Sequence, residues 1–301
     1  MSALVHNLYN DETIGQWQHE KTMMHSSGIW GRQPVLKYLR ERVLRSGNIV
    51  VDLGAGAGYP SLQMSACVGS AGRVIGIDLS KAMVAAARAH CRADNLFFEH
   101  GDITQRLLLT DELADVVTGF MVLHNLHLER MRAMFGEVGR ILKSSGCAVF
   151  LTMHPDAFEK HWELDFLSYD AFALRRYRDS VEKENIQIPG RARNTAGGEN
   201  SIDTVYHSRQ AVIQATHDAG LSLADEQDLW IDRETAVEIF GPQSIRKMPT
   251  VPIYWMLVLK RAVLSDQHAA DGVLDLEADV RRGAQPIQAN SRISANEHNP
   301  T

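Results

Sequence analysis

The chain has 301 residues, 45% of them hydrophobic and 23% charged, which suits one large α/β domain with a subdomain or two modest domains. Its net charge is −6 and its lysines and arginines form no stripe, so we expect no nucleic-acid partner. No apolar run is long enough to span a bilayer and the first residues lack a signal-peptide pattern, so we expect no membrane contact and a cytoplasmic location.

Two helical pieces precede the first predicted strand, and the Ser-Ser-Gly of residues 26–28 separates them. The second piece, residues 33–45, repeats apolar side chains at helical spacing, so it is expected to pack on a sheet.

A glycine-rich turn follows at residues 49–61. The β-branched run Ile49 to Val51 predicts a buried strand, and glycines occupy positions 54, 56 and 58 directly after it. Pro60 suits the first turn of a helix. A strand, a glycine turn and a helix N-terminus predict a ligand cradle, because glycine lets the backbone approach a ligand closely.

The details of this turn disfavour a dinucleotide. Tyr59 stands where the third glycine of the Gly-x-Gly-x-x-Gly fingerprint belongs, and Asp52 would repel a phosphate. A carboxylate could instead attract the ammonium group of a ligand such as S-adenosylmethionine (SAM).

Two further acids follow predicted strands. Residues 73–78 end in Asp78, about twenty residues beyond the glycines, a spacing at which an acid reaches ribose hydroxyls. Ser80 is a good N-cap for a helix over residues 82–91. The third strand, residues 96–100, leads to Asp102.

Together, Asp52-x-Gly54-x-Gly56-x-Gly58 and the later acids resemble the motifs of the class I SAM-dependent methyltransferases. The resemblance implies that the turn and Asp52 hold the amino-acid end of SAM, Asp78 the ribose, and Asp102 with Ile103 the adenine. The implied cofactor-binding residues are Asp52, Gly54, Ala55, Gly56, Gly58, Asp78, Leu79, Met83, Gly101, Asp102, Ile103, Phe120 and Met121.

The fourth and fifth strands are predicted at residues 114–121 and 147–152, with a helix over 129–142 between them. The run Val122 to Leu128 is similar to a segment of ubiquinone- and menaquinone-type and natural-product C- and O-methyltransferases. His124 therefore belongs near the methionine end of SAM, as a general base or as a structural residue of the turn. The catalytic candidates are His124, His127 and Tyr169, and no metal is expected.

Residues 153–207 are predicted to be an inserted lid, with amphipathic helices in its first part, a loop at 188–199 and a strand at 201–207. Its aromatic side chains either form a small core of their own or line a substrate chamber. By resemblance the N-terminal segment also covers the pocket, unless its aromatics only anchor a surface helix. The substrate-binding candidates are Tyr9, Trp17, Trp30, His154, Phe158, Trp162, Phe166 and Tyr206.

The rest of the chain predicts a helix at 208–219, a strand at 221–231 and a closing strand at 252–260, paired antiparallel at the sheet edge as in the family. The expected fold is a Rossmann-like seven-stranded α/β sheet with helices on both faces and an inserted lid. The expected regions are a helical segment (1–45), the SAM-binding core (46–152), the lid (153–207), the end of the core (208–263) and a disordered tail (264–301).

These features predict methyl transfer from SAM to a hydrophobic small molecule of secondary metabolism. The apolar lid favours C-methylation of a terpenoid, prenylated or aromatic acceptor. O- or N-methylation of an aromatic metabolite and SAM binding without transfer are the alternatives. Homo-oligomerisation through the N-terminal segment stays open.

Overall fold

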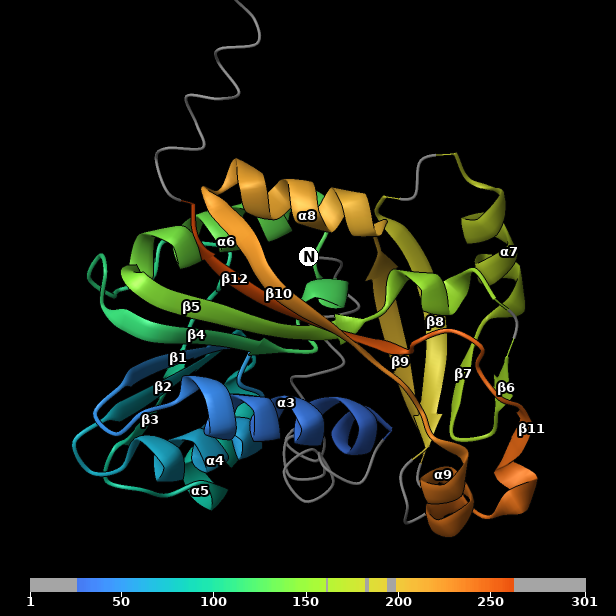
Figure 1. The fold of residues 1–301 in the computed structure, drawn as a ribbon, viewed down its shortest axis with the longest axis horizontal. Coiled ribbons are helices and arrows are strands. Elements are labelled where there is room, and N and C mark those ends of the chain that lie inside the picture. The colour runs from blue at the N-terminus through green and yellow to red at the C-terminus, as the bar shows by residue number, and fades with distance from the viewer. Residues whose placement is uncertain (1–25, 161, 182–183, 194–198, 263–301) are drawn as a thin grey trace, which may run out of the picture. The chain divides into compact units, whose positions relative to one another are not determined.

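The structure is a computed structural model and describes residues 26–160, 162–181, 184–193 and 199–262. Its main element is a seven-stranded sheet with the order β10-β12-β5-β4-β1-β2-β3 (Figure 1). The strands are β1 (Ile49–Leu53), β2 (Arg73–Asp78), β3 (Leu96–His100), β4 (Ala114–Phe120), β5 (Leu142–Met153), β10 (Leu221–Leu229) and β12 (Tyr254–Arg261). The predicted Rossmann-like fold is confirmed.

The antiparallel last strand is also confirmed, but its predicted place at the sheet edge is wrong. β12 lies between β5 and β10 and runs antiparallel to both of them. The connection through helix α8 (Arg209–Asp218) carries β10 two strand positions away from β5, and β12 then fills the position between them.

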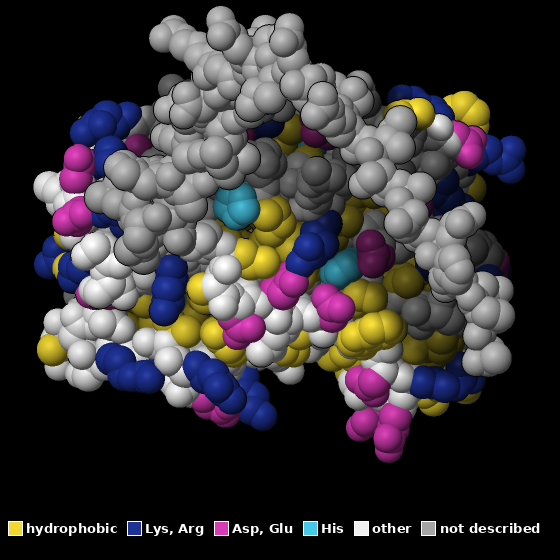
Figure 2. All heavy atoms as spheres, turned by 45° about the horizontal axis from the view of Figure 1, so that its top comes forward, with side chains coloured by type: hydrophobic (Ala, Val, Ile, Leu, Met, Phe, Trp, Pro, Cys, Tyr) yellow, Lys and Arg dark blue, Asp and Glu magenta, His cyan; other side chains and the backbone are white. Residues whose placement is uncertain are grey.

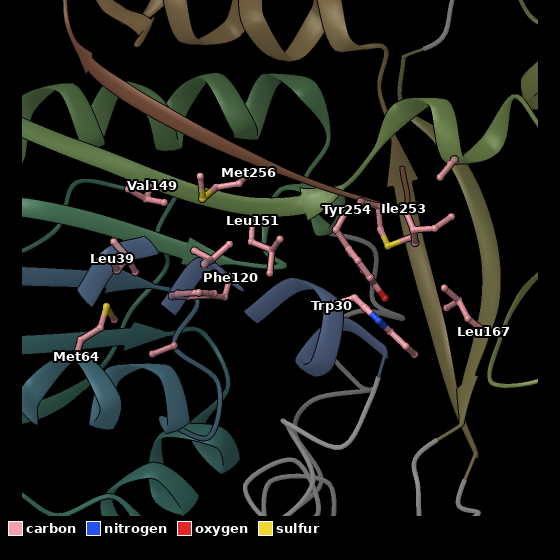
Figure 3. Packing of buried hydrophobic residues seen from close by; sticks show 14 of the residues in the cluster. Trp30, Leu39, Met64, Phe120, Val149, Leu151, Leu167, Ile253, Tyr254 and Met256 are labelled. Atoms are coloured by element: carbon pink, nitrogen blue, oxygen red, sulfur yellow. The ribbon is translucent and has the colours of Figure 1, made fainter. Parts of the chain in front are cut away.

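Helices cover both faces of this sheet. Figure 1 shows α6 (Leu128–Ile141) and α8 on one face, and α3 (Gln33–Tyr38), α4 (Tyr59–Val68) and α5 (Lys81–His90) on the other. Successive residues of β1 alternate between the two cores, Val50 in one and Val51 in the other. Figure 3 shows the α3–α4 side, where Met64 and Leu39 approach Phe120 and Val149. Burial on both faces explains why the central strands are almost continuously apolar.

The predicted helix at 33–45 is one part of a longer helical run. It consists of the π-turns η1 (Gly28–Arg32) and η2 (Leu39–Val43) on either side of α3. The indole of Trp30 donates to Asp232 at 2.8 Å, which fixes this run against the loop after β10. A helix that the sequence analysis did not predict, α9 (Arg233–Phe240), begins directly after that aspartate.

Four strands of the inserted region and β11, which follows α9, form a second sheet with the order β11-β6-β7-β8-β9, which we call the insertion sheet. Its strands are β6 (Glu163–Leu164), β7 (Leu167–Tyr169), β8 (Ile186–Arg193), β9 (Glu199–Tyr206) and β11 (Ile245–Lys247). Among the described residues of 153–207, only α7 (Ala171–Asp179) and the short 3₁₀ turn η4 (Pro155–Phe158) are helical, so one amphipathic helix takes the place of the several that were expected.

The predicted loop at 188–199 is wrong as well, because Ile186–Arg193 pairs along its length with β9. Pro189-Gly190 is a pair typical of turns, but it lies inside the strand. A Cβ on Gly190 would lie 2.5 Å from a ring carbon of Tyr169, so glycine makes room here for an aromatic ring.

Candidate cofactor and acceptor site

The glycine turn joins β1 to α4 with all three glycines in the left-handed region, at φ values of +69°, +57° and +86°. Its amides already have partners within the chain. Gly54 and Ala55 donate to the Ile77 carbonyl at 2.8 and 3.1 Å, and Gly56 donates to the Asp78 carboxylate at 2.8 Å. An anion-binding cradle needs free amides, so these three N–H groups are not arranged for a phosphate.

Asp52 is buried, with 1% of its surface exposed. Its two carboxylate oxygens accept hydrogen bonds from the Ser61 hydroxyl at 2.5 Å and the Thr118 hydroxyl at 2.8 Å. Burial raises the pKa of Asp52 to about 6. The carboxylate ties β1 to α4 and β4 and thereby positions the glycine turn. Its direct contact with a ligand ammonium group stays a prediction.

Asp78 lies at the end of β2 beside the same turn. One oxygen accepts from the Gly56 amide and the other from the Ser80 amide, both at 2.8 Å. Burial raises the pKa of this carboxyl group. An ionised carboxylate has about four acceptor positions, so two are left for a pair of ribose hydroxyls.

Asp102 and Ile103 follow β3. Asp102 accepts from the amide and hydroxyl of Thr104 at 2.9 and 2.7 Å and forms an ion pair with Arg130 at 2.6 Å. Although burial alone would raise it, these contacts hold the pKa of Asp102 below its usual range. Gly101 donates its amide to the Asp78 carbonyl at 3.0 Å, so the second and third acids are held together. Arg130 lies on α6 and belongs to no motif, so it was not among the predicted site residues.

The two predicted adenine neighbours differ in exposure. Met83 is buried, and its amide donates to the Ser80 hydroxyl at 3.2 Å, which confirms Ser80 as the N-cap of α5. Leu79 is half-buried, and its carbonyl lies 2.9 Å from a ring nitrogen of His100. Leu79 therefore keeps accessible surface beside the acids, whereas Met83 packs in the core.

The end of β4 closes the other side of the turn. Met121 has φ +61°, a left-handed conformation that is rare outside glycine, and its amide donates to the Leu151 carbonyl at 2.7 Å. Phe120, just before it, is buried. A Cβ on Gly54 would lie 2.9 Å from Val122, so the turn and the β4 end are in direct contact. Such strain at a strand end is typical of functional sites.

Comparison with known families agrees with this geometry. Residues 50–146 match the family model of a methyltransferase domain. The chain carries a class I SAM-dependent methyltransferase domain.

Curated relatives match part of the chain. An arsenite methyltransferase of Halobacterium salinarum is 36% identical over 103 residues, covering 33% of this chain and 26% of that protein. A ribosomal RNA large subunit methyltransferase E of Bdellovibrio bacteriovorus is 28% identical over 40% of this chain and 65% of its own. A demethylmenaquinone methyltransferase of Lactobacillus johnsonii is 28% identical over 46% and 58%. The chain thus spans less than two thirds of each of these relatives.

Solved structures are similar over more of the chain. A chain from the complex of the Haloferax volcanii Trm112 methyltransferase activator matches 84% of this chain and 99% of its own, with a TM-score of 0.55 and 20% identity. A SAM-dependent methyltransferase from Mesorhizobium loti matches 76% and 96%, with a TM-score of 0.53 and 22% identity. At these identities the likeness concerns the fold.

The residues of this methyltransferase domain fit SAM. SAM has no phosphate, which suits a turn whose amides are already used, and its ribose suits the two open acceptor positions of Asp78. A Cβ on Gly56 would meet nothing within 4 Å, so the outer side of the turn is open.

Among the residues that the structure describes, no helix is long and apolar enough to cross a membrane. The same residues contain no group of acidic, histidine and cysteine side chains that could hold a metal ion.

His124 lies in η3 (Leu123–Asn125), just beyond the end of β4. Its side chain keeps some accessible surface, but its Nδ1 atom is covered and has no hydrogen-bond partner. Burial and, to a lesser extent, the positive charge of Arg32 lower the pKa of His124 to about 3. The imidazole is therefore neutral at physiological pH, and it would be a weak general base.

Arg32 is a second residue that the sequence analysis missed. It lies in η1, and its guanidinium donates to the Ser27 hydroxyl at 2.6 Å. Burial raises the pKa values of Asp52 and Tyr254, and the positive charge of Arg32 opposes this rise to a smaller extent. Arg32 thus places a cation near the carboxyl ends of β1 and β4. No motif in the sequence marks it, because it reaches the site from a helix before the first strand.

The other two histidines have structural partners. The Nδ1 atom of His127 lies 3.3 Å from the side-chain oxygen of Asn185, which also accepts from the Leu128 amide at 2.8 Å. His154 accepts from the Asp156 amide at 3.0 Å, and its other ring nitrogen lies 3.2 Å from Asp228. Both ring nitrogens of His154 therefore have partners within the chain, which disfavours a contact with substrate.

Several predicted substrate residues lie in the hydrophobic core between the insertion sheet and the large sheet. Phe158 and Phe166 are almost fully buried, and Phe166 stacks on Trp30 with 5.6 Å between ring centroids. Trp162 is half-buried and donates to the Ala157 carbonyl at 2.7 Å. Of the two predicted roles, a core rather than the wall of a substrate chamber accounts for the contacts of these rings. Tyr9 and Trp17 lie outside the described residues.

Tyr169 and Tyr206 differ from these core residues. Their rings lie 4.9 and 3.7 Å from the ring of Phe158, yet both hydroxyl groups are buried without a hydrogen-bond partner. Burial raises the pKa of both phenols well above 10, so they stay protonated and can donate a proton in a hydrogen bond. A buried unpaired polar group costs about 1–3 kcal/mol, which natural cores avoid unless a ligand or water supplies a partner.

Proposed function

We propose that the protein transfers the methyl group of SAM to a hydrophobic small molecule of secondary metabolism. The observation that carries this proposal is the arrangement of Asp52, Asp78 and Asp102 at the ends of β1, β2 and β3, around a turn whose amides are already paired. In this proposal Asp78 binds the ribose, Asp102 and the Ile103 amide meet the adenine, and the turn lies against the amino-acid end.

Arg32 adds a role for the carboxylate of SAM. That carboxylate belongs to the amino-acid end, beside the turn, where the Arg32 charge already acts on Asp52. A guanidinium suits a carboxylate because it offers parallel N–H donors. Arg32 and Asp52 together would then match the two opposite charges of an amino acid.

The distribution of charge supports a small molecule as the methyl acceptor. The net charge is −6. On the face drawn in Figure 2, the described acidic and basic side chains are interspersed around apolar ones, and they form no continuous basic area. A phosphate backbone would be bound by clustered basic side chains. A cytoplasmic location, without a nucleic-acid partner, belongs to this proposal.

The pKa values of the candidate bases favour a carbon acceptor. SAM supplies an electrophilic methyl group. A carbon acceptor can attack it with its π-electrons, so the enzyme only has to align the two reactants and exclude water. An oxygen acceptor would need a base that titrates near neutral pH. His124 has a pKa of about 3, and the pKa values of Tyr169 and Tyr206 lie well above 10. O- or N-methylation, with His127 as base, is the alternative.

The proposal is tested by methyl transfer from radiolabelled SAM into an extract of small molecules, with wild type and Asp78→Ala in parallel. We expect label in an organic-soluble product with wild type, and a SAM affinity at least about tenfold weaker in the variant, since one or more charged hydrogen bonds are lost. Glu99→Ala, on the exposed end of β3, is the matched control and should leave affinity unchanged. Unchanged affinity in Asp78→Ala would contradict the ribose assignment. Tight SAM binding without any labelled product would favour a binding protein that does not transfer methyl groups.

A further inference from the structure

The described part of the chain contains four buried side-chain polar atoms without a hydrogen-bond partner. They are His124 Nδ1, Arg130 Nε and the hydroxyl oxygens of Tyr169 and Tyr206. Arg130 is otherwise satisfied, because its terminal nitrogen bonds Asp102 and Thr104. The other three side chains make no hydrogen bond through these atoms.

Contacts bring these three side chains to one junction. Tyr206 ends β9, which packs against the η3 turn that contains His124. The next residue, His207, places a ring nitrogen 2.8 Å from the Leu126 carbonyl, which fixes this end of β9 against the loop after β4. His124 and Tyr206 therefore lie on facing elements.

Tyr169 reaches the same cluster from β7. Its ring lies 4.9 Å from that of Phe158, and the Tyr206 ring lies 3.7 Å from the same ring. The ring lies across the backbone of β8, since a Cβ on Gly190 would be 2.5 Å away. This close approach fixes the direction of the Tyr169 side chain, so its unpaired hydroxyl does not result from a free rotamer.

Tyr254 links this cluster to the carboxyl end of β5 in the large sheet. It begins β12 opposite Met153, the last residue of β5, and Figure 3 shows its side chain directed toward Trp30. Its hydroxyl is paired, at 2.8 Å, with that of Ser26. The electrostatic influence of Tyr254 extends to Tyr169 and Tyr206, and that of Arg32 extends to Tyr254 and His124. The unpaired phenols thus lie within electrostatic reach of Tyr254, whose strand begins beside the end of β5.

We infer that the hydroxyls of Tyr169 and Tyr206 bind an oxygen atom of the methyl acceptor, which is therefore a phenol or an enol rather than a pure hydrocarbon. This inference rests on the proposed function and names the acceptor class of the same site. Both phenols are protonated donors, and two unpaired donors on rings that both contact Phe158 suit a phenolic or enolic oxygen. The surrounding rings of Phe158 and Trp162 suit the flat apolar part of such a molecule.

The test is a pair of probes of similar shape, 2-naphthol and naphthalene, titrated into the full chain loaded with S-adenosylhomocysteine. We expect 2-naphthol to bind at least about tenfold more tightly, because only it offers an oxygen to the phenols. Tyr169→Phe and Tyr206→Phe should each reduce this preference to within about threefold while the affinity for S-adenosylhomocysteine stays unchanged. Tyr177→Phe, in the same aromatic cluster but with a hydroxyl that is not among the unpaired atoms, should keep the preference.

Equal binding of the two probes, binding of neither, or a preference that survives both substitutions would overturn the inference. Failure of the proposed function is recognised separately, because S-adenosylhomocysteine itself would then not bind.

A second experiment measures thermal stability and needs no probe molecule. Tyr206→Phe should leave the melting temperature unchanged or raise it, whereas Tyr254→Phe, which loses the bond to Ser26, should lower it. An equal decrease in both variants would mean that the Tyr206 hydroxyl already has a partner, and would overturn the inference.

Discussion

The cofactor region and the insertion sheet differ in whether their polar side chains have hydrogen-bond partners within the chain. Asp52, Asp78 and Asp102 each accept at least two hydrogen bonds from the chain itself. Tyr169 and Tyr206 are equally well placed by packing, yet their hydroxyls accept or donate none. The first region is held in shape before a ligand arrives, whereas the second leaves positions that only a ligand or water could fill.

This difference has a physical reason. Glycine has more conformational freedom than any other residue, so the neighbours of a turn with three left-handed glycines must fix it through many bonds. The rings around Phe158 are fixed by packing alone, which places no demand on the hydroxyl groups at their tips. The comparison can be tested in both regions.

The largest effect is expected at the glycine turn. Gly58→Ala should lower the free energy of unfolding by about 3–5 kcal/mol, because φ is +86° and the new Cβ would lie 2.5 Å from Phe98. Gly56→Ala is the matched control, with φ +57° and nothing within 4 Å, and should cost about 1 kcal/mol. Urea unfolding of both variants measures this. Equal losses would mean that packing against Phe98 does not define the turn.

The next effect concerns the pH dependence that Asp52 contributes. Its pKa is raised from 3.8 to about 6 in the folded state, a difference of about 2 pH units, so the folded state binds the proton more tightly than the unfolded state. This contribution to stability is greatest below pH 4 and is lost as pH rises through 6, by up to about 3 kcal/mol.

Asp52→Asn removes the titrating group, so the difference in unfolding free energy between wild type and variant should fall as pH rises from 4 to 7. Urea unfolding at intervals of half a pH unit measures it. A difference that is constant over this range would show that the carboxyl group titrates normally.

A smaller effect is expected where the two regions meet. Asn185 accepts from the Leu128 amide at the start of α6 and has φ +55°. Asn185→Ala loses this bond and keeps the strained backbone, so it should cost about 1–2 kcal/mol. Asn185→Gly loses the bond but relieves the strain, and should cost less. Thermal unfolding distinguishes the two, and a larger loss for glycine would contradict this account of the junction.

The smallest expected effect is on the rate of methyl transfer. Since His124 has a pKa of about 3 and Tyr169 and Tyr206 stay protonated, none of them changes protonation between pH 6 and 8. With a carbon acceptor, the single-turnover rate should therefore vary by less than about twofold over this range. A tenfold rise per pH unit would instead indicate a base, and O- or N-methylation.

The cofactor region was predictable because its pattern is local. A strand, a glycine turn and acids at strand ends occupy consecutive stretches, so Asp52, Asp78 and Ser80 could be placed from spacing alone. Their hydrogen bonds could not. Thr118 and Arg130 donate to Asp52 and Asp102 from distant elements that carry no motif, and Arg32 acts on Asp52 through its charge.

The insertion sheet was predicted poorly because tertiary contacts override its local signals. Pro189-Gly190 reads as a turn, but the space that glycine leaves is filled by Tyr169 from another strand. The position of β12 inside the large sheet likewise depends on where the α8 connection places β10, which no residue of β12 reveals.

The central claim is tested most directly by isothermal titration of the full chain with S-adenosylhomocysteine, with NAD⁺ titrated in parallel. The paired amides of Gly54, Ala55 and Gly56 and the open acceptor positions of Asp78 predict binding of the first ligand at about micromolar affinity and none of the second. Binding of NAD⁺ alone, or of neither ligand, would contradict the assignment of this turn as a SAM site.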